Sequence, residues 1–417
     1  MPHRPLKESP LEESSIVRKD FIIVFMFLFN AFTWWYIMPI ILEDLLVVLN
    51  GTVTQTLLIW MSYFAAIVGS SIIGSILSNR IRRLSFLYAW IVSGIGVSLL
   101  PALLSSSSSI HVLVVSVLFG ASFGLGMPSC LAFFADWTLV ENRGRIGGIV
   151  LLVTNLSAPL FAISFDMFNL TMGSVILAAW RGFGLIVLFL KPEEKLIPER
   201  KKNPSFAAIL QNRSFILYFV AWLMFCLIDR FETPIQRNSL GDSYEKLLML
   251  GPILGSISAF VGGLLSDRIG RKRIVLYGFV SLGIAYAIIG ISSVRIELWY
   301  ISFSVISISA GLVWVLFILI LWGDLSQSGT REKYYAIGTI PFFLTNIIQL
   351  LSEEHVTLID ETRAFSLAAF FLFLAVLPLL YAPETLPEKK IELRRLRKYV
   401  EGARKVKEKH EEKGVKG

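Results

Sequence analysis

One acid stands among several bases in the stretch Gly263-Leu264-Leu265-Ser266-Asp267-Arg268-Ile269-Gly270-Arg271-Lys272-Arg273, which joins two long apolar runs. Glycine has no Cβ, so Gly263 can let two helices approach closely and Gly270 can let the backbone turn sharply. The Asp267 carboxylate can bind the N-terminus of a helix or a facing arginine, because both carry positive charge. We therefore expect a tight turn whose charged groups make specific contacts.

A weaker copy of this stretch, Ser75-Ile76-Leu77-Ser78-Asn79-Arg80-Ile81-Arg82-Arg83, lies 188 residues upstream. At this offset Asn79 matches Asp267, and Arg83 matches Arg271. The upstream copy is therefore recognisable, although the amide of Asn79 stands where the other copy has the acid Asp267.

An acid and a base seven residues apart form another repeated pattern, at Asp136 and Arg143 and again at Asp324 and Arg331. The offset between the two occurrences is once more 188 residues. Coincidence could supply one such match, but two unrelated patterns with a single offset indicate a duplication. The sequence therefore predicts two copies of one unit.

The composition indicates a membrane protein. Apolar residues make up 55% of the 417 residues, charged residues 17%, and the mean hydropathy is +0.67, which is more apolar surface than a soluble protein of this length could bury. The net charge is +8, but the bases lie between and after the apolar runs, where they suit anionic lipid headgroups. We expect membrane lipids as partners and no nucleic acid.

The residues that usually build catalytic or metal sites are scattered. The four histidines are far apart, and both cysteines, Cys130 and Cys226, fall inside apolar runs, where they are expected to be small buried hydrophobic side chains. A membrane enzyme would need clustered His, Asp or Glu at the membrane boundary, or a nucleotide-binding loop, and the sequence has neither. We expect no enzyme activity, no catalytic residues, no metal and no cofactor.

Twelve apolar runs lie between residues 21 and 382, and each approaches or exceeds the ~20 residues that a helix needs to cross the hydrocarbon core. Backbone polar groups find no water there, so every run is expected to be a helix, the tenth of them over residues 299–323. The expected fold class is an all-α membrane protein with twelve transmembrane helices in two pseudo-symmetric six-helix halves. The expected divisions are an N-terminal segment (1–20), an N-terminal bundle (21–190), a linker (191–212), a C-terminal bundle (213–383) and a basic tail (384–417).

Lysine and arginine set the orientation, because cytoplasmic loops carry an excess of both. With both termini in the cytoplasm, one base, Arg181, lies inside a span, and only five fall near the outer loops, namely Arg230, Arg237, Lys246, Arg295 and Arg363. The polar N-terminal segment lacks the features of a cleaved signal peptide. We expect a multi-pass protein of the plasma membrane with cytoplasmic termini.

These motifs resemble those of a known family. The Gly263–Arg273 stretch resembles the signature loop of the major facilitator superfamily, and the stretch from Asp136 to Arg145 resembles the loop after that family's fourth span. The segments Pro192-Glu193-Glu194 and Pro383-Glu384-Thr385 resemble the Pro-Glu endings of its sugar-porter-like members. The resemblance covers residues 18–388 and implies the nested-repeat fold of that superfamily. Asn79 departs from the pattern, so the intact signature loop is the C-terminal one.

A transporter needs breakable contacts on one side, because it must hold two arrangements of its halves within a few kcal/mol. We expect Asp267 to face Arg331, and Asp136 to pair with Arg143, when the cytoplasmic side is closed. The alternative is that these residues are ordinary interfacial charges that set the topology. The expected latch consists of Gly263, Asp267, Arg268, Gly270, Arg271, Asp136, Arg143, Asp324 and Arg331.

Arg181 is the charge most deeply placed in a span, too far from either end to reach water by extending its side chain. It should face protein or water and find a partner, with Asp166 or a backbone carbonyl as candidates. The resemblance implies that the sixth span lies outside the cavity, so both a structural role and a substrate contact remain open.

Span seven carries Asp229, Arg230 and Glu232 within four residues, and the resemblance implies that spans one, four, seven and ten line the cavity. The alternative is that this span ends early and that these residues are in water. Span one offers Asn30 and Trp34; an amide in hydrocarbon commonly binds another helix or a ligand. The candidate substrate-binding and coupling residues are Asp229, Arg230, Asn30, Trp34 and Arg181, with Asp229 as the proton-coupling acid.

The sequence and the resemblance together predict a secondary active transporter that moves a small polar or organic solute across the cytoplasmic membrane by alternating access. We expect protons as the coupling ion and a monomer as the working unit. Efflux of drugs or other amphipathic compounds is the alternative within the same superfamily. A membrane sensor that signals through the basic tail and transports nothing is an alternative of a different class.

Overall fold

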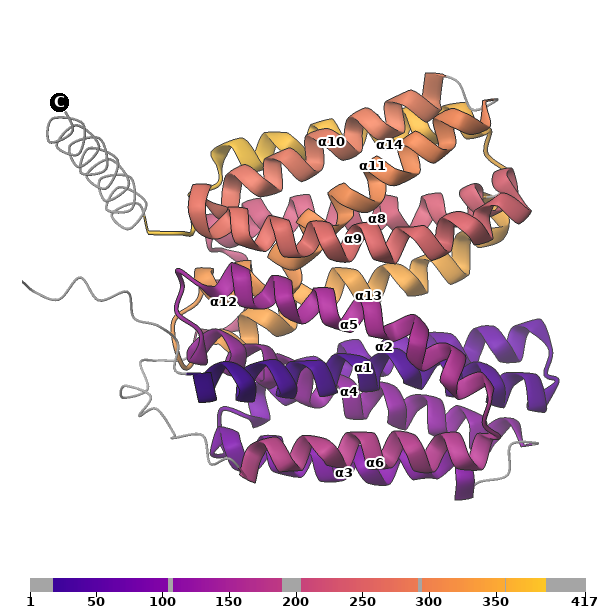
Figure 1. Cartoon of the computed structure of the whole chain (residues 1–417), viewed down its shortest axis with the longest axis vertical. Helices are drawn as coiled ribbons and strands as arrows, with labels where there is room; N and C mark the ends of the chain where they lie inside the picture. Colours follow the sequence, from indigo (N-terminus) through magenta and orange to yellow (C-terminus); the bar gives the residue numbers. More distant parts are fainter. Residues whose placement is uncertain (1–17, 104–107, 190–203, 292–294, 357, 388–417) are drawn as a thin grey trace, which may run out of the picture.

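The computed structural model describes residues 18–103, 108–189, 204–291, 295–356 and 358–387 (Figure 1). Every regular element in these ranges is a helix, and twelve helices are long and apolar enough to cross a membrane. The expected all-α fold class and number of spans are therefore confirmed. Most of the linker and nearly all of the basic tail lie outside the described residues.

The N-terminal half packs around aromatic side chains. Phe27, Trp34 and Trp90 meet edge to face near its centre, with ring centroids 6.3 Å apart in both the Phe27–Trp90 and the Trp34–Trp90 pair. Such edge-to-face contacts stabilise an apolar core beyond simple burial. Its six helices are α1 (Arg18–Leu49), α2 (Val53–Leu77), α3 (Arg83–Leu103), α4 (Ser109–Trp137), α5 (Arg143–Asp166) and α6 (Leu170–Phe189).

The C-terminal half has its own aromatic core, in which Trp222 stacks on Phe317 with ring centroids 4.9 Å apart. A short helix, α7 (Phe206–Leu210), precedes it within the expected linker. Its spans are α8 (Arg213–Leu240), α9 (Asp242–Ile269), α10 (Arg271–Ile291), α11 (Ile296–Trp314) continued by η1 (Val315–Ile320) and α12 (Leu321–Leu325), α13 (Arg331–Val356) and α14 (Glu361–Tyr381).

The halves meet where α5 packs on α9 and α2 packs on α13. In Figure 1 the N-terminal helices lie below the C-terminal ones, and α5 and α13 run along the boundary. A Cβ on Gly263 would lie 2.2 Å from the carbonyl oxygen of Gly144, so α5 and α9 can cross this closely only without side chains there. Gly270 has a φ of +108° at the turn between α9 and α10, a region that glycine alone adopts without strain.

The tenth span differs from its expected single helix over 299–323, because Val315–Ile320 is π-helical. A π-helical turn takes one more residue than an α-helical turn, and such turns often occur at functional sites. The turn rotates the following segment, α12, which carries Asp324. The apolar pattern gives no sign of this change, since it is uniform through the span.

Candidate functional site

Asp324 binds two arginines at one end of the bundle. Its Oδ1 pairs with Nη1 of Arg143 from the other half, and its Oδ2 accepts a hydrogen bond from Nε of Arg271 in its own half at 3.2 Å. The three side chains are at most 1% exposed. A buried carboxylate is stable only when charged donors surround it, and Asp324 has one from each half.

Asp136 repeats this arrangement in the N-terminal half. Its Oδ2 lies 2.5 Å from Nη1 of Arg83 in the same half, and its Oδ1 pairs with Nη1 of Arg331 from the C-terminal half. Each aspartate thus holds one arginine of its own half and one of the other half. The two sets are related by the 188-residue offset, so the duplicated sequence yields a duplicated contact.

Asp267 joins the halves in another way, by capping a helix of the opposite half. Its carboxylate accepts hydrogen bonds from the backbone N–H groups of Gly144 at 2.9 Å and Arg145 at 2.7 Å, at the N-terminus of α5. Arg271 Nη1 lies 2.5 Å from the same carboxylate. A helix N-terminus carries partial positive charge and free N–H groups, so it binds an acid well.

We call these charged residues, with Glu332, the charge network, and the end of the bundle where they lie the network end. In Figure 1 this is the end where α12 lies. The charge network consists of Arg83, Asp136, Arg143, Asp267, Arg271, Asp324, Arg331 and Glu332.

A cavity of about 330 Å³ lies between the halves, lined by α1 and α5 on one side and by α8, α9 and α11 on the other. Asp229, Glu232 and Gln236 reach it from α8, and Tyr36 and Asn155 reach it from the N-terminal half. The lining segment of α9 begins at Tyr244, whereas Asp267 of the charge network lies near the other end of that helix. The cavity is therefore displaced from the network end towards the opposite end.

Aromatic side chains from both halves meet beside the cavity. Trp35 of α1 contacts Phe342 and Phe343 of α13, with ring centroids 6.1 and 6.0 Å apart. The guanidinium of Arg230 lies 5.2 Å from the Phe342 ring centroid, and its Nε is 3.7 Å from Oδ2 of Asp229. Arg230 thus bridges the acid that lines the cavity and the aromatic contact between the halves.

The described part of the chain thus has two related halves, charged contacts at one end and a cavity between the halves. Residues 23–339 match the sequence profile of the Major Facilitator Superfamily. The chain belongs to the major facilitator superfamily. Comparison with curated proteins found no match.

Solved structures of the superfamily share the fold. The crystal structure of the human organic anion transporter MFSD10 (TETRAN) gives a TM-score of 0.70 at 14% sequence identity, covering 87% of this chain and 99% of that chain. The structure of the proton:xylose symporter XylE bound to 6-bromo-6-deoxy-D-glucose gives a TM-score of 0.71 at 13% identity, covering 89% and 97%. At these identities the likeness establishes the fold of the chain alone.

The pairing expected for the superfamily loops is wrong in its partners. Arg331 pairs with Asp136 rather than Asp267, and Arg143 pairs with Asp324 rather than Asp136. The reason is that the acid and the base of one seven-residue pattern do not bind each other. Each binds the matching residue of the other half, so Asp136 pairs with Arg331 and Asp324 pairs with Arg143. In the described part of the chain, none of the ion pairs involves Arg268, which is exposed at the end of α9.

The upstream copy of the signature loop has Asn79 in place of an acid, and an acid from the other half takes over the contact with Arg83. Asn79 donates a hydrogen bond to the carbonyl oxygen of Ser75 at 2.7 Å, in its own helix. Arg83 instead binds Oε1 of Glu332 from the C-terminal half, with an Nε–Oε1 distance of 2.9 Å. Glu332 corresponds to Gly144 at the 188-residue offset. The acid missing at Asn79 is thus supplied across the interface.

The other candidate site residues, Asn30, Trp34 and Arg181, form a separate cluster inside the N-terminal half. Arg181 of α6 is fully buried, donates to Oδ1 of Asn30 at 3.0 Å, and lies 4.3 Å from the ring centroid of Trp34 and 4.0 Å from that of Trp90. The side chain of Asp166, one expected partner, lies outside the described part of the chain. The partners found are an amide and two indole faces, rather than a backbone carbonyl.

The five candidate substrate-binding and coupling residues therefore lie in two separate places. Asp229 lines the cavity and Arg230 lies beside it, whereas the Asn30 cluster lies in the core, because α6 packs on α1 and α3. Asn155 and Gln236 also line the cavity and are not among the residues expected from the sequence. Asn155 is a polar residue in an apolar span, which is a signal for such a role, whereas Gln236 stands in a polar stretch that gives none. Cys130 and Cys226 are free and buried, as expected.

Proposed function

We propose that this superfamily member is a secondary active transporter that moves a small polar or organic solute by alternating access. The observation that carries the proposal is the exchange of arginines between the halves at the network end, with a cavity between the same halves displaced towards the other end. Such contacts close one side, and breaking them would let the halves separate there. A carrier needs this bistable arrangement, whereas a static scaffold does not.

The network end is proposed to face the cytoplasm of a plasma-membrane protein whose termini both lie on that side. The support is the positive-inside rule, because the loops at this end carry far more lysines and arginines than the loops at the other end. In this orientation the cavity lies towards the outer side while the charge network is intact. A monomer suffices, since both walls of the cavity come from one chain.

Proton coupling is proposed through Asp229. Its carboxylate lines the cavity between the halves, and its only ion-pair partner among the described residues is Arg230, at 3.7 Å. A solute that bound either member of this pair would compete with the ion pair. Protonation of Asp229 and binding of solute are therefore linked in the same cavity.

The test is transport by the purified protein in liposomes, with and without a pH gradient, against a panel of solutes. Sugars and organic anions head the panel, because the structural neighbours are described as a xylose symporter and an organic anion transporter. Accumulation of one solute that requires the pH gradient supports the proposal. Passage of no panel member, either by accumulation or by exchange, contradicts it.

Efflux of amphipathic compounds is the second candidate within this class. It is favoured by the apolar and aromatic part of the cavity wall, which includes Phe303 and Trp314. Energised vesicles of opposite orientation distinguish the two directions. Uptake of an amphipathic compound into inside-out vesicles only, driven by their pH gradient, supports efflux.

A further inference from the structure

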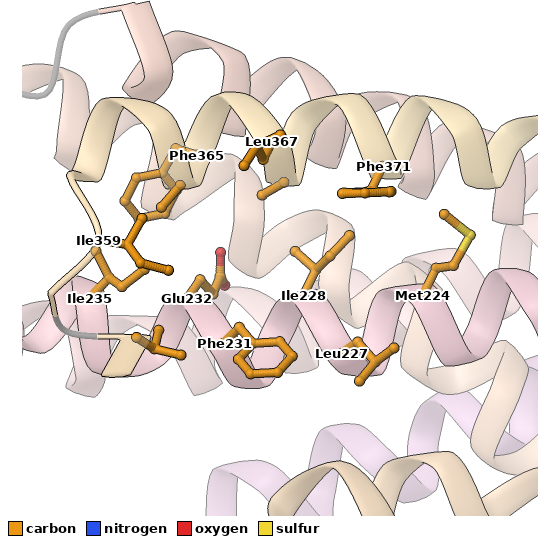
Figure 2. A pocket seen from close by; sticks show the side chains of 13 residues that line it. Met224, Leu227, Ile228, Phe231, Glu232, Ile235, Ile359, Phe365, Leu367 and Phe371 are labelled. Carbon is orange, nitrogen blue, oxygen red and sulfur yellow. The ribbon is translucent and has the colours of Figure 1, made fainter. Parts of the chain in front are cut away.

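A second cavity, of about 540 Å³, lies within the C-terminal half between α8, α14 and the end of α13. Its walls are aliphatic and aromatic, with Ile228 and Phe231 from α8 and Phe365 and Phe371 from α14 among them. The one ionisable lining residue is Glu232 (Figure 2). We call this cavity the lateral pocket. Its volume is in the range that holds a drug-sized molecule.

The lateral pocket opens towards the apolar outer surface of the bundle. Leu367 and Phe371 of α14 line it and are also 56% and 44% exposed, so they belong both to the wall and to the outer surface. In a membrane this surface contacts hydrocarbon chains. A molecule dissolved in the bilayer can therefore reach the pocket without passing through the cavity between the halves.

Glu232 is an unusual wall residue for such a place. The residue is only 7% exposed, and its Oε2 is buried without a hydrogen-bond partner. Figure 2 shows the carboxyl group pointing from α8 into the space between α8 and α14. Among the described residues, no ion pair involves Glu232, and the nearby Arg230 is paired with Asp229. Burial of an unpaired charge is costly, so an ionised Glu232 lacks the cation that would stabilise it.

We propose that the lateral pocket binds an amphipathic monocation, an amine with an apolar body. The body fills the aliphatic and aromatic space, and the ammonium group binds the Glu232 carboxylate. A neutral lipid chain would fill the same space but leave Oε2 unpaired. An amphipathic anion would place like charges together. Charge complementarity thus selects the cation.

Glu232 also lines the cavity between the halves, because both cavities border the same turn of α8. A cation on Glu232 would thus stand at the boundary between the lateral pocket and that cavity. The inference concerns binding alone and holds whether or not the bound molecule is transported. Its test therefore uses no transport measurement, and its failure is distinct from failure of the proposed function.

The experiment measures binding of 4-phenylbutylamine, 4-phenylbutanol and 4-phenylbutanoate, which share an apolar body and differ in charge. The full chain is placed in nanodiscs of phosphatidylcholine, which has no net charge, and binding to empty nanodiscs is subtracted. The amine is expected to bind more tightly than the alcohol, and the carboxylate most weakly. Equal affinity for all three would mean that the pocket holds any apolar chain, and would overturn the proposal.

Variants locate the site. Glu232→Gln should weaken the amine at least about tenfold, equivalent to about 1.4 kcal/mol, and leave the alcohol unchanged, which also shows that the variant is folded. Ala368→Phe, which fills the pocket from α14, should weaken both the amine and the alcohol. Glu297→Gln, at an exposed position in the first turn of α11, is the matched control and should change neither.

One further variant separates the two cavities. Asn155→Leu alters the cavity between the halves but no residue of the lateral pocket, and it leaves the Asp229–Arg230 pair in place. The amine should keep its affinity in this variant. If Asn155→Leu abolishes amine binding while Ala368→Phe does not, the cation binds between the halves and the assignment to the lateral pocket is wrong.

Discussion

Arg143 at the start of α5 and Asp324 at the end of the tenth span come from opposite halves of the chain and form an ion pair that is almost completely buried. A buried ion pair contributes little net stability, but loss of one partner leaves the other charge uncompensated. The pair therefore makes closure of the network end conditional on both halves being in place. Loss of either partner is therefore expected to cost more stability than formation of the pair contributes.

Asp324→Asn should strongly destabilise the closed network end, because it removes the charge that faces both Arg143 and Arg271. Removal of one partner from a buried pair costs about 3–5 kcal/mol. We expect a lower Tm and a longer distance between spin labels at positions 82 and 268, which are exposed on opposite halves. An unchanged label distance would show that Asp324 does not hold this end closed.

Asp136→Asn and Arg331→Ala should be less than additive, because the two side chains share one ion pair. Residues in direct contact show coupling energies of about 0.5–3 kcal/mol in double-mutant cycles. The measurement is the unfolding free energy, or the Tm where unfolding is irreversible. Asp267→Asn combined with Arg331→Ala is the comparison cycle and should show weaker coupling. Equal coupling in both cycles would contradict the partner exchange.

Asn79→Asp should rescue Glu332→Gln. The single Glu332 variant removes one acid from Arg83, whereas an acid at position 79 would stand four residues before Arg83, as Asp267 stands four residues before Arg271. We expect Glu332→Gln to lower the Tm and the double variant to recover most of the loss. Simple addition of the two single effects would show that the acid at 332 does not substitute for one at 79.

Asp229→Asn should abolish accumulation of solute driven by a pH gradient and spare exchange of labelled for unlabelled solute. Exchange needs a working cavity but no net proton movement, whereas accumulation needs a group that gains and loses the proton. Both are measured in the same liposomes once a solute is known. Glu297→Gln serves as the control, since Glu297 lies outside both cavities. Accumulation at the level of the unmodified protein would exclude Asp229 as the coupling acid.

The spans and the two glycines of the signature loop could be predicted from sequence, because they depend on local composition and backbone freedom. The ion pairs could not, since the seven-residue patterns say nothing about which half supplies the partner. Arg181 shows the same limit: its burial follows from its place in a span, but its indole and amide partners come from α1 and α3. The π-helical turn before Asp324 is as apolar as the α-helical residues before it, so its sequence does not distinguish it and it is seen only in the structure.

The exchanged pairs Arg143–Asp324 and Asp136–Arg331 have the geometry of an isologous dimer contact, in which one patch meets its own copy. In a dimer of identical six-helix subunits, a single mutation would alter both contacts at once. Fusion into one chain frees each contact to change alone. The two copies already differ in this way: Asn79 stands where the C-terminal copy has Asp267, and Glu332, which binds Arg83, stands where the N-terminal copy has Gly144.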